Sequence, residues 1–363
     1  MAIDKIESAG LETSTNQPNF RNIIINGDMS IAQRATSATS LTGSSYATVD
    51  RFKQEISSQG TWTQSQSTTV PTGQGFATSL KMDCTTADAS PAASDYIFIT
   101  QKIEGQNLQY LKKGTSSAEQ LTLSFWVRSN KTGTYITRLR DADNTRSTSK
   151  SYTISSADTW EKKTITFDAD TTGPLNNDNG TSLQLYFYLG AGTDYTSGSL
   201  ATTWESNTNA NNAVGQVNLA DSTDNEWYVT GVQLEAGTIA SDFEFLPVDA
   251  NLLRCQRYFQ KIEKESSNTV LTVLQAYGSE TAIGCLPAIT KFRALPSLST
   301  TGTFNCWTAP ASDNAIGSIA LYSASTTQNG FIFTRSSQGS LSAGNATGLH
   351  TQSAASVLFD AEL

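Results

Sequence analysis

The sequence contains little charge and little hydrophobic material. Charged residues make up 16% and hydrophobic residues 37% of its 363 residues, whereas soluble proteins typically have about 25% and about 45–50%. Long stretches of Ala, Leu, Glu and Lys are missing, so few helices are expected. Such a polar chain suits thin β-layers with hydroxyl-rich surfaces and turns marked by Gly.

Basic residues are scarce as well. The formal net charge is −9, so the chain lacks the basic stripe with which proteins bind nucleic acid or an anionic membrane. No apolar run approaches the roughly 18 residues of a membrane span, and no membrane insertion is expected. Residues 1–20 lack the basic and apolar regions of a secretion signal. They predict either a flexible segment or one that orders against a partner.

Motifs for catalysis are missing. The one histidine, His350, lies in a polar stretch, so a Ser-His-Asp triad, a Cys-His pair or a zinc site with two histidines has no support. The four cysteines show no metal-ligand spacing and are expected to be buried free thiols. Neither a P-loop nor a GxGxxG motif is present. We therefore expect neither an enzyme nor a cofactor.

Pairs of carboxylates are the remaining route to catalysis, as in a glycan depolymerase. Each pair lies in a turn-like context where Asp forms Asx turns. One pair also begins a stretch similar to the first half of a calcium loop. Its twelfth position is Asn179 rather than a bidentate Glu, which leaves a structural calcium ion open. The pairs are Asp141 with Asp143, Asp168 with Asp170, and Asp221 with Asp224.

Short runs of alternating apolar and polar residues dominate residues 21–246. LTLSFWVR and SLQLYFYLG are two of these runs, and their period of two is typical of half-buried strands. In WYVTGVQLE we place Tyr228, Val232 and Leu234 on the buried face, with Thr230 as a polar exception. Together the runs predict a jelly-roll-like sandwich of two antiparallel sheets.

Three further segments complete the predicted all-β organisation. Residues 190–226 are polar with spaced aromatics, which indicates a packed loop. Residues 247–262 predict a short helical hinge with Asp249 as its N-cap. Residues 263–363 return to short strands and predict a smaller C-terminal β-sandwich domain.

Strand alternation also predicts an aromatic and polar outer face. If three of the runs are neighbours, their outward side chains bring Trp, Tyr, Arg and Gln together. Aromatic rings stack on the C–H faces of sugars, while Arg and Gln bond the hydroxyls. The same face could instead pack against another subunit or beneath the long loop. With one residue of that loop, the glycan-binding candidates are Trp126, Arg128, Arg138, Arg140, Gln184, Tyr186, Tyr188 and Trp204.

Several phrases, in their order along the chain, are similar to those of bacteriophage tail proteins with a carbohydrate-binding-module-like jelly-roll domain. They include NIIINGDMSIAQRATS, TVDRF, LTLSFWVRS, EWYVTGVQLEAGTIASDFEFLP and LLRCQRYFQKI. The resemblance implies a tail fibre or receptor-binding subunit, made in the host cytoplasm and assembled as a homotrimer into the virion. Its implied partners are other virion proteins and a host surface glycan, with residues 1–20 docking to the virion and 263–363 facing the host.

Host attachment through glycans is therefore the leading functional hypothesis. One alternative is a capsid decoration, head-fibre or collar protein with a purely structural role. A second is a glycan depolymerase that uses paired carboxylates. The resemblance carries no catalytic residues onto this sequence.

Overall fold

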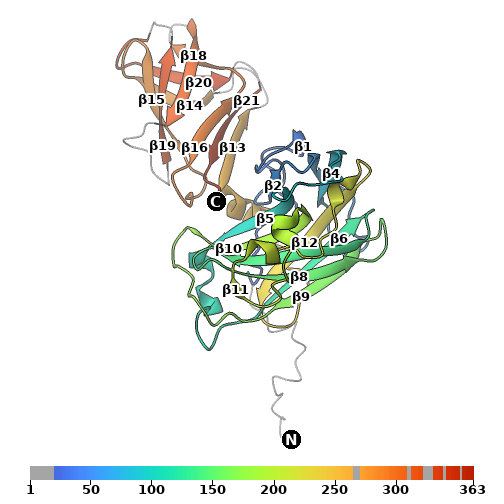
Figure 1. Cartoon of the computed structure of the whole chain (residues 1–363). Helices are drawn as coiled ribbons and strands as arrows, with labels where there is room; N and C mark the ends of the chain where they lie inside the picture. The colour runs from blue at the N-terminus through green and yellow to red at the C-terminus, as the bar shows by residue number, and fades with distance from the viewer. Residues whose placement is uncertain (1–19, 265–269, 309–311, 322–329, 338–340, 352–353) are drawn as a thin grey trace, which may run out of the picture. The chain divides into compact units, whose positions relative to one another are not determined.

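The computed structural model describes residues 20–264, 270–308, 312–321, 330–337, 341–351 and 354–363. Residues 1–19, for which a docking or flexible segment is expected, lie outside this description. The chain divides into two units, one comprising Met1–Asn251 with Leu363 and the other Leu252–Glu362. The bar in Figure 1 colours the first from blue to yellow and the second in orange and red.

The first unit is a sandwich of two six-stranded antiparallel sheets, as predicted (Figure 1). Sheet A runs in the order β1 (Ser37–Leu41), β3 (Thr61–Ser67), β4 (Ser79–Thr86), β12 (Glu226–Ala236), β6 (Leu121–Ser129) and β9 (Glu161–Phe167). Sheet B runs in the order β11 (Glu205–Ser206), β8 (Arg146–Ile154), β7 (Gly133–Asp141), β10 (Thr181–Ala191), β5 (Tyr96–Glu104) and β2 (Lys53–Ser57).

The apolar faces of the alternating runs form the core between the sheets. Leu123 and Phe125 of β6 and Leu185 of β10 are fully buried, and Phe187 of β10 is 1% exposed. The rings of Phe125 and Phe187 meet edge-to-face across the two sheets, with centroids 5.0 Å apart. Burial of each such side chain contributes about 1.5–3 kcal/mol, so the period of two in the sequence determines which face of each sheet turns inward.

Strand β12 departs from the predicted alternation at Gly231. Trp227 and Val229 lie in the core, so Tyr228 points to the outer face of sheet A, contrary to our expectation. The pairing of β12 with β6 shifts between Thr230 and Gln233. Gly231 has a φ of +63°, the left-handed conformation typical of a bulge residue. The extra residue restores the expected inward direction from Val232 onward.

The segment 190–226 is a packed loop, as its aromatics indicate. It contains α1 (Thr193–Thr196), β11 and the 3₁₀ turns η5 (Asn209–Asn211) and η6 (Leu219–Asp221). Ala213 joins Tyr186 and Tyr188 in a cluster on the outer face of sheet B, with Tyr195 and Leu200 packed against it. Two further 3₁₀ turns, η3 (Gly105–Asn107) and η4 (Gln109–Leu111), follow β5.

The predicted hinge is shorter as a helix than the sequence suggests. Helix α2 covers Val248–Gln256, because Phe259–Lys264 pairs with the last strand as β13. Within the described ranges no helix has both the length and the apolar character needed to cross a membrane. Within the described residues none of the four cysteines forms a disulfide, and Cys285 is exposed rather than buried.

The second unit is also built of strands, as expected. A three-stranded sheet has the order β13 (Phe259–Lys264), β21 (Ala355–Asp360) and β16 (Ser297–Thr301). The other strands close on themselves in the order β14 (Val270–Ala276), β15 (Thr281–Pro287), β19 (Gly330–Ser337), β18 (Ser312–Leu321), β17 (Phe304–Thr308) and β20 (Ala346–Thr351). The predicted smaller β-domain therefore consists of a small sheet and a closed six-stranded structure.

Candidate functional site

The predicted glycan-binding residues lie on two different sheets. Strand β6, with Trp126 and Arg128, pairs with β12 and β9 in sheet A, so the three runs are not all neighbours and do not form one common face. Strands β7 and β10 do pair in sheet B, with Tyr186 opposite Arg138. Sequence alternation predicts the direction of side chains but does not predict which strands share a sheet.

The long loop covers part of the predicted face on sheet B. Tyr188 is 2% and Arg138 4% exposed. The Arg138 guanidinium donates to the side-chain oxygen of Asn207 in the loop, and the Ser149 hydroxyl donates to the Asn212 carbonyl oxygen at 2.9 Å. The covered residues therefore hold the loop in place. This is the alternative to glycan binding in which the predicted face packs beneath the long loop.

Trp204 likewise has structural partners. Its indole N–H donates to the Asp168 carbonyl oxygen at 2.8 Å, and the Lys113 ammonium lies 5.2 Å from the centroid of its ring. That ammonium lies 2.9 Å from Asp170 Oδ2 and also bonds the Asp141 carboxylate. Trp204 thus covers a buried ionic cluster and is not part of an open face.

The Asp168–Gly173 stretch, which resembles half of a calcium loop, uses its central carboxylate for ion pairs. Asp170 accepts from Arg146 at 2.9 and 3.0 Å as well as from Lys113. Burial by itself raises the pKa of Asp170, but the hydrogen bonds from Arg146 and Lys113 outweigh it and bring the pKa below its ordinary value of 3.8. The cations at this carboxylate are therefore side chains of the chain itself.

A pocket opens on the outer face of sheet A around Trp126. Its volume is about 340 Å³. Three phenylalanines form one wall, with ring centroids 5.1 Å apart for Phe76 and Phe243 and 4.8 Å apart for Phe243 and Phe245. Trp126 is partly exposed and Phe245 is 50% exposed. The full lining is Gly73, Gln74, Phe76, Ser124, Trp126, Lys162, Gly231, Asp242, Phe243 and Phe245.

The bulge in β12 makes room for this pocket. A Cβ atom on Gly231 would lie 2.6 Å from the Phe76 ring and 3.2 Å from Trp126 Cδ1. Only glycine combines the positive φ with such close aromatic neighbours. The feature that misled the prediction for Tyr228 therefore shapes the pocket.

Gln233, just after the bulge, places the phenylalanine wall. Its side chain accepts from the Glu244 backbone N–H at 2.8 Å and donates to the Asp242 carbonyl oxygen at 3.2 Å. This clamp fixes the extended segment on both sides of Phe243. Phe243 and Phe245, two residues apart on such a segment, both pack against Phe76.

Two charged side chains at the pocket are unengaged. Lys162, opposite Trp126 on β9, and Asp242 are both exposed. Among the described residues, neither the Lys162 ammonium nor the Asp242 carboxylate has an ion pair or hydrogen bond, although the Asp242 main chain does. The pocket thus combines an aromatic floor with one free donor and one free acceptor.

Arg128, two residues beyond Trp126, is held by its neighbours. It bonds Asp158 at 2.8 Å and Glu226 at 3.1 Å, and its guanidinium carbon lies 4.9 Å from the Tyr228 ring centroid. Burial raises the pKa of Glu226, but the hydrogen bonds from Lys81, Tyr228 and Arg128 lower it by more, so that it lies below its ordinary value of 4.5. Arg128 therefore braces the sheet beside the pocket.

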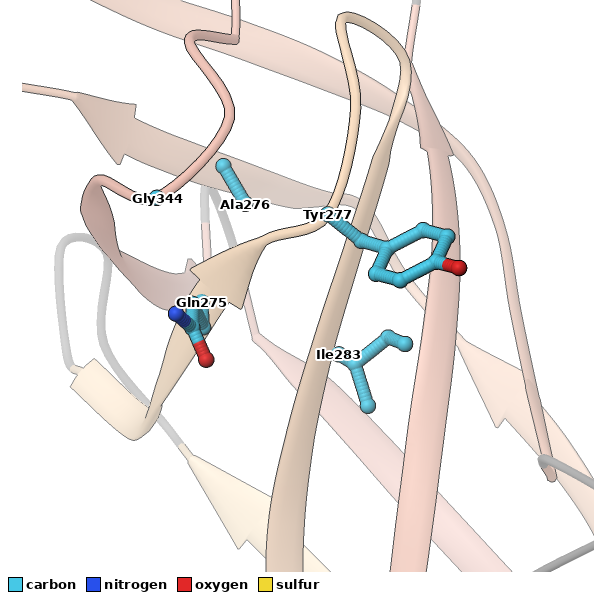
Figure 2. A pocket seen from close by; sticks show the side chains of 5 residues that line it. All are labelled: Gln275, Ala276, Tyr277, Ile283 and Gly344. Carbon is cyan, nitrogen blue, oxygen red and sulfur yellow. The ribbon is translucent and has the colours of Figure 1, made fainter.

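A hollow of similar volume, about 340 Å³, lies in the second unit. Figure 2 shows its lining residues, which come from the end of β14, the turn after it, β15 and the segment before β20. Tyr277 is 76% exposed, and only Gln275 and Tyr277 bring polar side-chain atoms. This hollow has no charged lining residue, so the Trp126 pocket is the stronger candidate.

Of the predicted candidates, only Trp126 lies in the pocket. Its partners Phe76, Phe243 and Phe245 were not predicted as binding residues, because they come from segments between strands. The Phe-x-Phe pattern in DFEF indicates an extended segment with one apolar face, but nothing in the sequence says which strand that face meets.

No protein-family model and no curated protein sequence matches the chain. Among solved structures, similarity is found to the enzymatically active domain of tailspike protein 4 of bacteriophage CBA120, with 13% identity and a TM-score of 0.32, covering 60% of this chain and 21% of the tailspike chain. A family 11 carbohydrate-binding module of a Clostridium thermocellum cellulase has 13% identity and a TM-score of 0.26, covering 55% of this chain and 99% of the module. The N-terminal cellulose-binding domain of a Cellulomonas fimi β-1,4-glucanase has 15% identity and a TM-score of 0.24, covering 46% of this chain and 83% of that domain.

Proposed function

We propose that this chain binds a glycan in the pocket around Trp126, without transforming it. The observation that carries the proposal is the combination in one hollow of an exposed aromatic floor with the unengaged Lys162 and Asp242 side chains. A sugar ring has the matching character, because its C–H faces are apolar and its rim carries hydroxyls. A purely apolar ligand would make no use of either charged group.

The geometry suggests a role for each side chain. The Trp126 indole stacks on one face of a sugar ring, and Phe245 provides a second apolar surface at the rim. The Lys162 ammonium donates to a hydroxyl or ring oxygen, and the Asp242 carboxylate accepts from a hydroxyl. Gln74, exposed on the loop before Phe76, can bond a neighbouring hydroxyl.

Within this proposal the chain is a virion adhesion protein that attaches a phage to host surface glycans. The sequence resemblance to phage tail fibre and receptor-binding proteins supports this part. It also supports a homotrimer with other virion proteins as partners. Because a small pocket binds a sugar weakly, presenting three copies together would raise the avidity without any new contact.

A structural role in the virion is the second candidate. Large apolar side chains are exposed along the end of the first unit, with Ile239 58%, Phe245 50% and Val248 69% exposed. Exposed apolar groups of this kind favour a protein contact. Antibody labelling of virions separates the two roles, because label on the head alone would contradict adhesion.

The glycan proposal is tested with purified protein on immobilised host-surface polysaccharides. Trp126→Ala is expected to weaken binding at least about tenfold, as removal of a central aromatic contact does. The matched control is Tyr110→Ala, which removes another exposed aromatic, 49% exposed, on η4. Equal binding by wild type and Trp126→Ala, with unchanged melting temperatures, would show that the pocket is not the site.

A further inference from the structure

Two cations face outward on sheet B on either side of one glutamine. Gln184 of β10 is opposite Lys102 of β5 on one side and opposite Arg140 of β7 on the other. All three share the outer face with Tyr186, because Leu183 and Leu185 point into the core. Two strand spacings put the cationic strands roughly 10 Å apart.

Neither cation has an acidic partner. Among the described residues no carboxylate forms an ion pair with Lys102 or Arg140. The acids on the same face are engaged elsewhere, since Glu55 pairs with Lys53 at 2.9 Å and Glu104 accepts from Gln106. In a chain with a net charge of −9, two such unpaired cations on the strands that flank β10 are unexpected.

The charges around Lys102 do not compensate its positive charge either. Burial lowers the pKa of its ammonium, and repulsion by Lys53, Arg51 and Arg140 lowers it further, while the Glu55 carboxylate acts in the opposite direction. A bound anion would relieve this repulsion, because opposite charges within a few ångströms favour the charged form of a lysine.

Gln184 supplies a neutral donor between the two cations. Its side-chain oxygen accepts from Arg140 Nη1 at 3.2 Å and from the Tyr186 hydroxyl. In the part of the chain that the structure describes, its Nε2 amide donates to no acceptor. Lys102, Gln184 and Arg140 therefore place an ammonium, an amide and a guanidinium side by side on one face, and all three groups are hydrogen-bond donors.

We propose that Lys102, Gln184 and Arg140 form a second ligand site for the anionic group of an acidic sugar, either a carboxylate or a sulfate. The anion lies above Gln184 and accepts from its amide and from the two flanking cations. The sugar part of this proposal rests on the proposed function, but the site is separate from the Trp126 pocket, which is on the other sheet.

The test is calorimetric titration of the full chain with three probes. Tetragalacturonate carries carboxylates, a neocarrageenan tetrasaccharide carries sulfates, and neutral galactotetraose carries neither. At least one acidic probe is expected to bind about tenfold or more tightly than the neutral one. The double variant Lys102→Gln/Arg140→Gln is expected to lose at least about tenfold of that affinity.

A matched control removes the same charge elsewhere. Lys131→Gln/Lys163→Gln breaks the ion pairs of Lys131 with Asp221 and of Lys163 with Glu161, and it should bind the acidic probe as wild type does. Trp126→Ala should also retain this binding. Melting temperatures establish that each variant is folded.

Three results would overturn the site. One is that neither acidic probe binds more tightly than galactotetraose, and another is that the Lys102→Gln/Arg140→Gln variant binds like wild type. The third is loss of acidic binding in Trp126→Ala alone, which would move the acidic ligand to the Trp126 pocket and leave the proposed function intact.

Discussion

The ammonium of Lys113 lies 2.9 Å from Asp170 Oδ2, in a cage of oxygen atoms inside the first unit. The Asp141 carboxylate and the carbonyl oxygens of Thr172 and Gly173, the latter two at 3.0 and 2.9 Å, complete the cage. The side chains of Lys113, Asp141 and Asp170 are 8%, 0% and 4% exposed. A lysine thus occupies a position whose surroundings are typical of a bound cation.

Removal of this ammonium should destabilise the first unit. Lys113→Ala leaves two buried carboxylates with less compensation, and breaking a buried pair in this way costs about 3–5 kcal/mol. Arg146 still pairs with Asp170, so we expect the lower end of that range in chemical denaturation. The neighbouring Lys112→Ala breaks only an exposed pair with Glu119 and should change stability by about 1 kcal/mol or less. Equal effects of the two substitutions would contradict this account.

Calcium should partly restore the stability of Lys113→Ala. The oxygen atoms that Lys113 bonds are carboxylate and carbonyl oxygens, which are the ligands that Ca²⁺ prefers. We expect calcium to raise the melting temperature of the variant while leaving wild type unchanged. No response of the variant to calcium would show that the cage closes when the lysine is lost.

Acid should weaken the fold through Asp170. Its pKa is lower in the folded chain than its ordinary value of 3.8, so its ionised form stabilises the fold above about pH 4. This contribution is lost as the pH falls through the folded pKa. Asp170→Asn should therefore be less stable than wild type at neutral pH and lose less stability on acidification. Asp168→Asn, whose exposed carboxylate lies 3.4 Å from Lys150, should keep the wild-type pH profile in denaturant titrations.

Trp204→Ala should reduce stability but not glycan binding. The substitution removes the hydrogen bond to Asp168 and the aromatic cover over Lys113, together worth about 2 kcal/mol. Thermal unfolding measures the first effect and the polysaccharide assay the second. Trp126→Ala is expected to do the reverse. Reduced glycan binding by a folded Trp204→Ala variant would return Trp204 to the binding site.

Gly231→Ala should impair the Trp126 pocket. The new methyl group would meet the Phe76 ring and Trp126 Cδ1, so both rings must move and glycan binding should weaken. The positive φ adds about 1–2 kcal/mol of backbone strain. Gly215→Ala is the control, because Gly215 also has a positive φ, +88°, its added Cβ would meet only Thr134 Cγ2 at 4.0 Å, and it does not line the pocket. If both variants bind alike, the bulge does not shape the binding surface.

The sequence by itself determined the all-β class and most of the buried faces. Alternation is a local property with a period of two, so Leu123, Phe125 and Phe187 could be assigned to the core from their own strands. It also indicated that the loop 190–226 is packed and that Trp126 points outward. The one misplaced face, at Tyr228, follows from a bulge that inserts a residue at Gly231.

Only the tertiary structure decided which outward residues meet. Strand order in a sheet depends on contacts between residues far apart in sequence, and period-two alternation contains no information about it. The structure therefore separated Trp126 from Tyr186 and Arg140 and brought Phe76, Phe243 and Lys162 to Trp126. It also placed Lys102 beside Gln184, and it filled the oxygen cage at Asp141 and Asp170 with the side chain of Lys113.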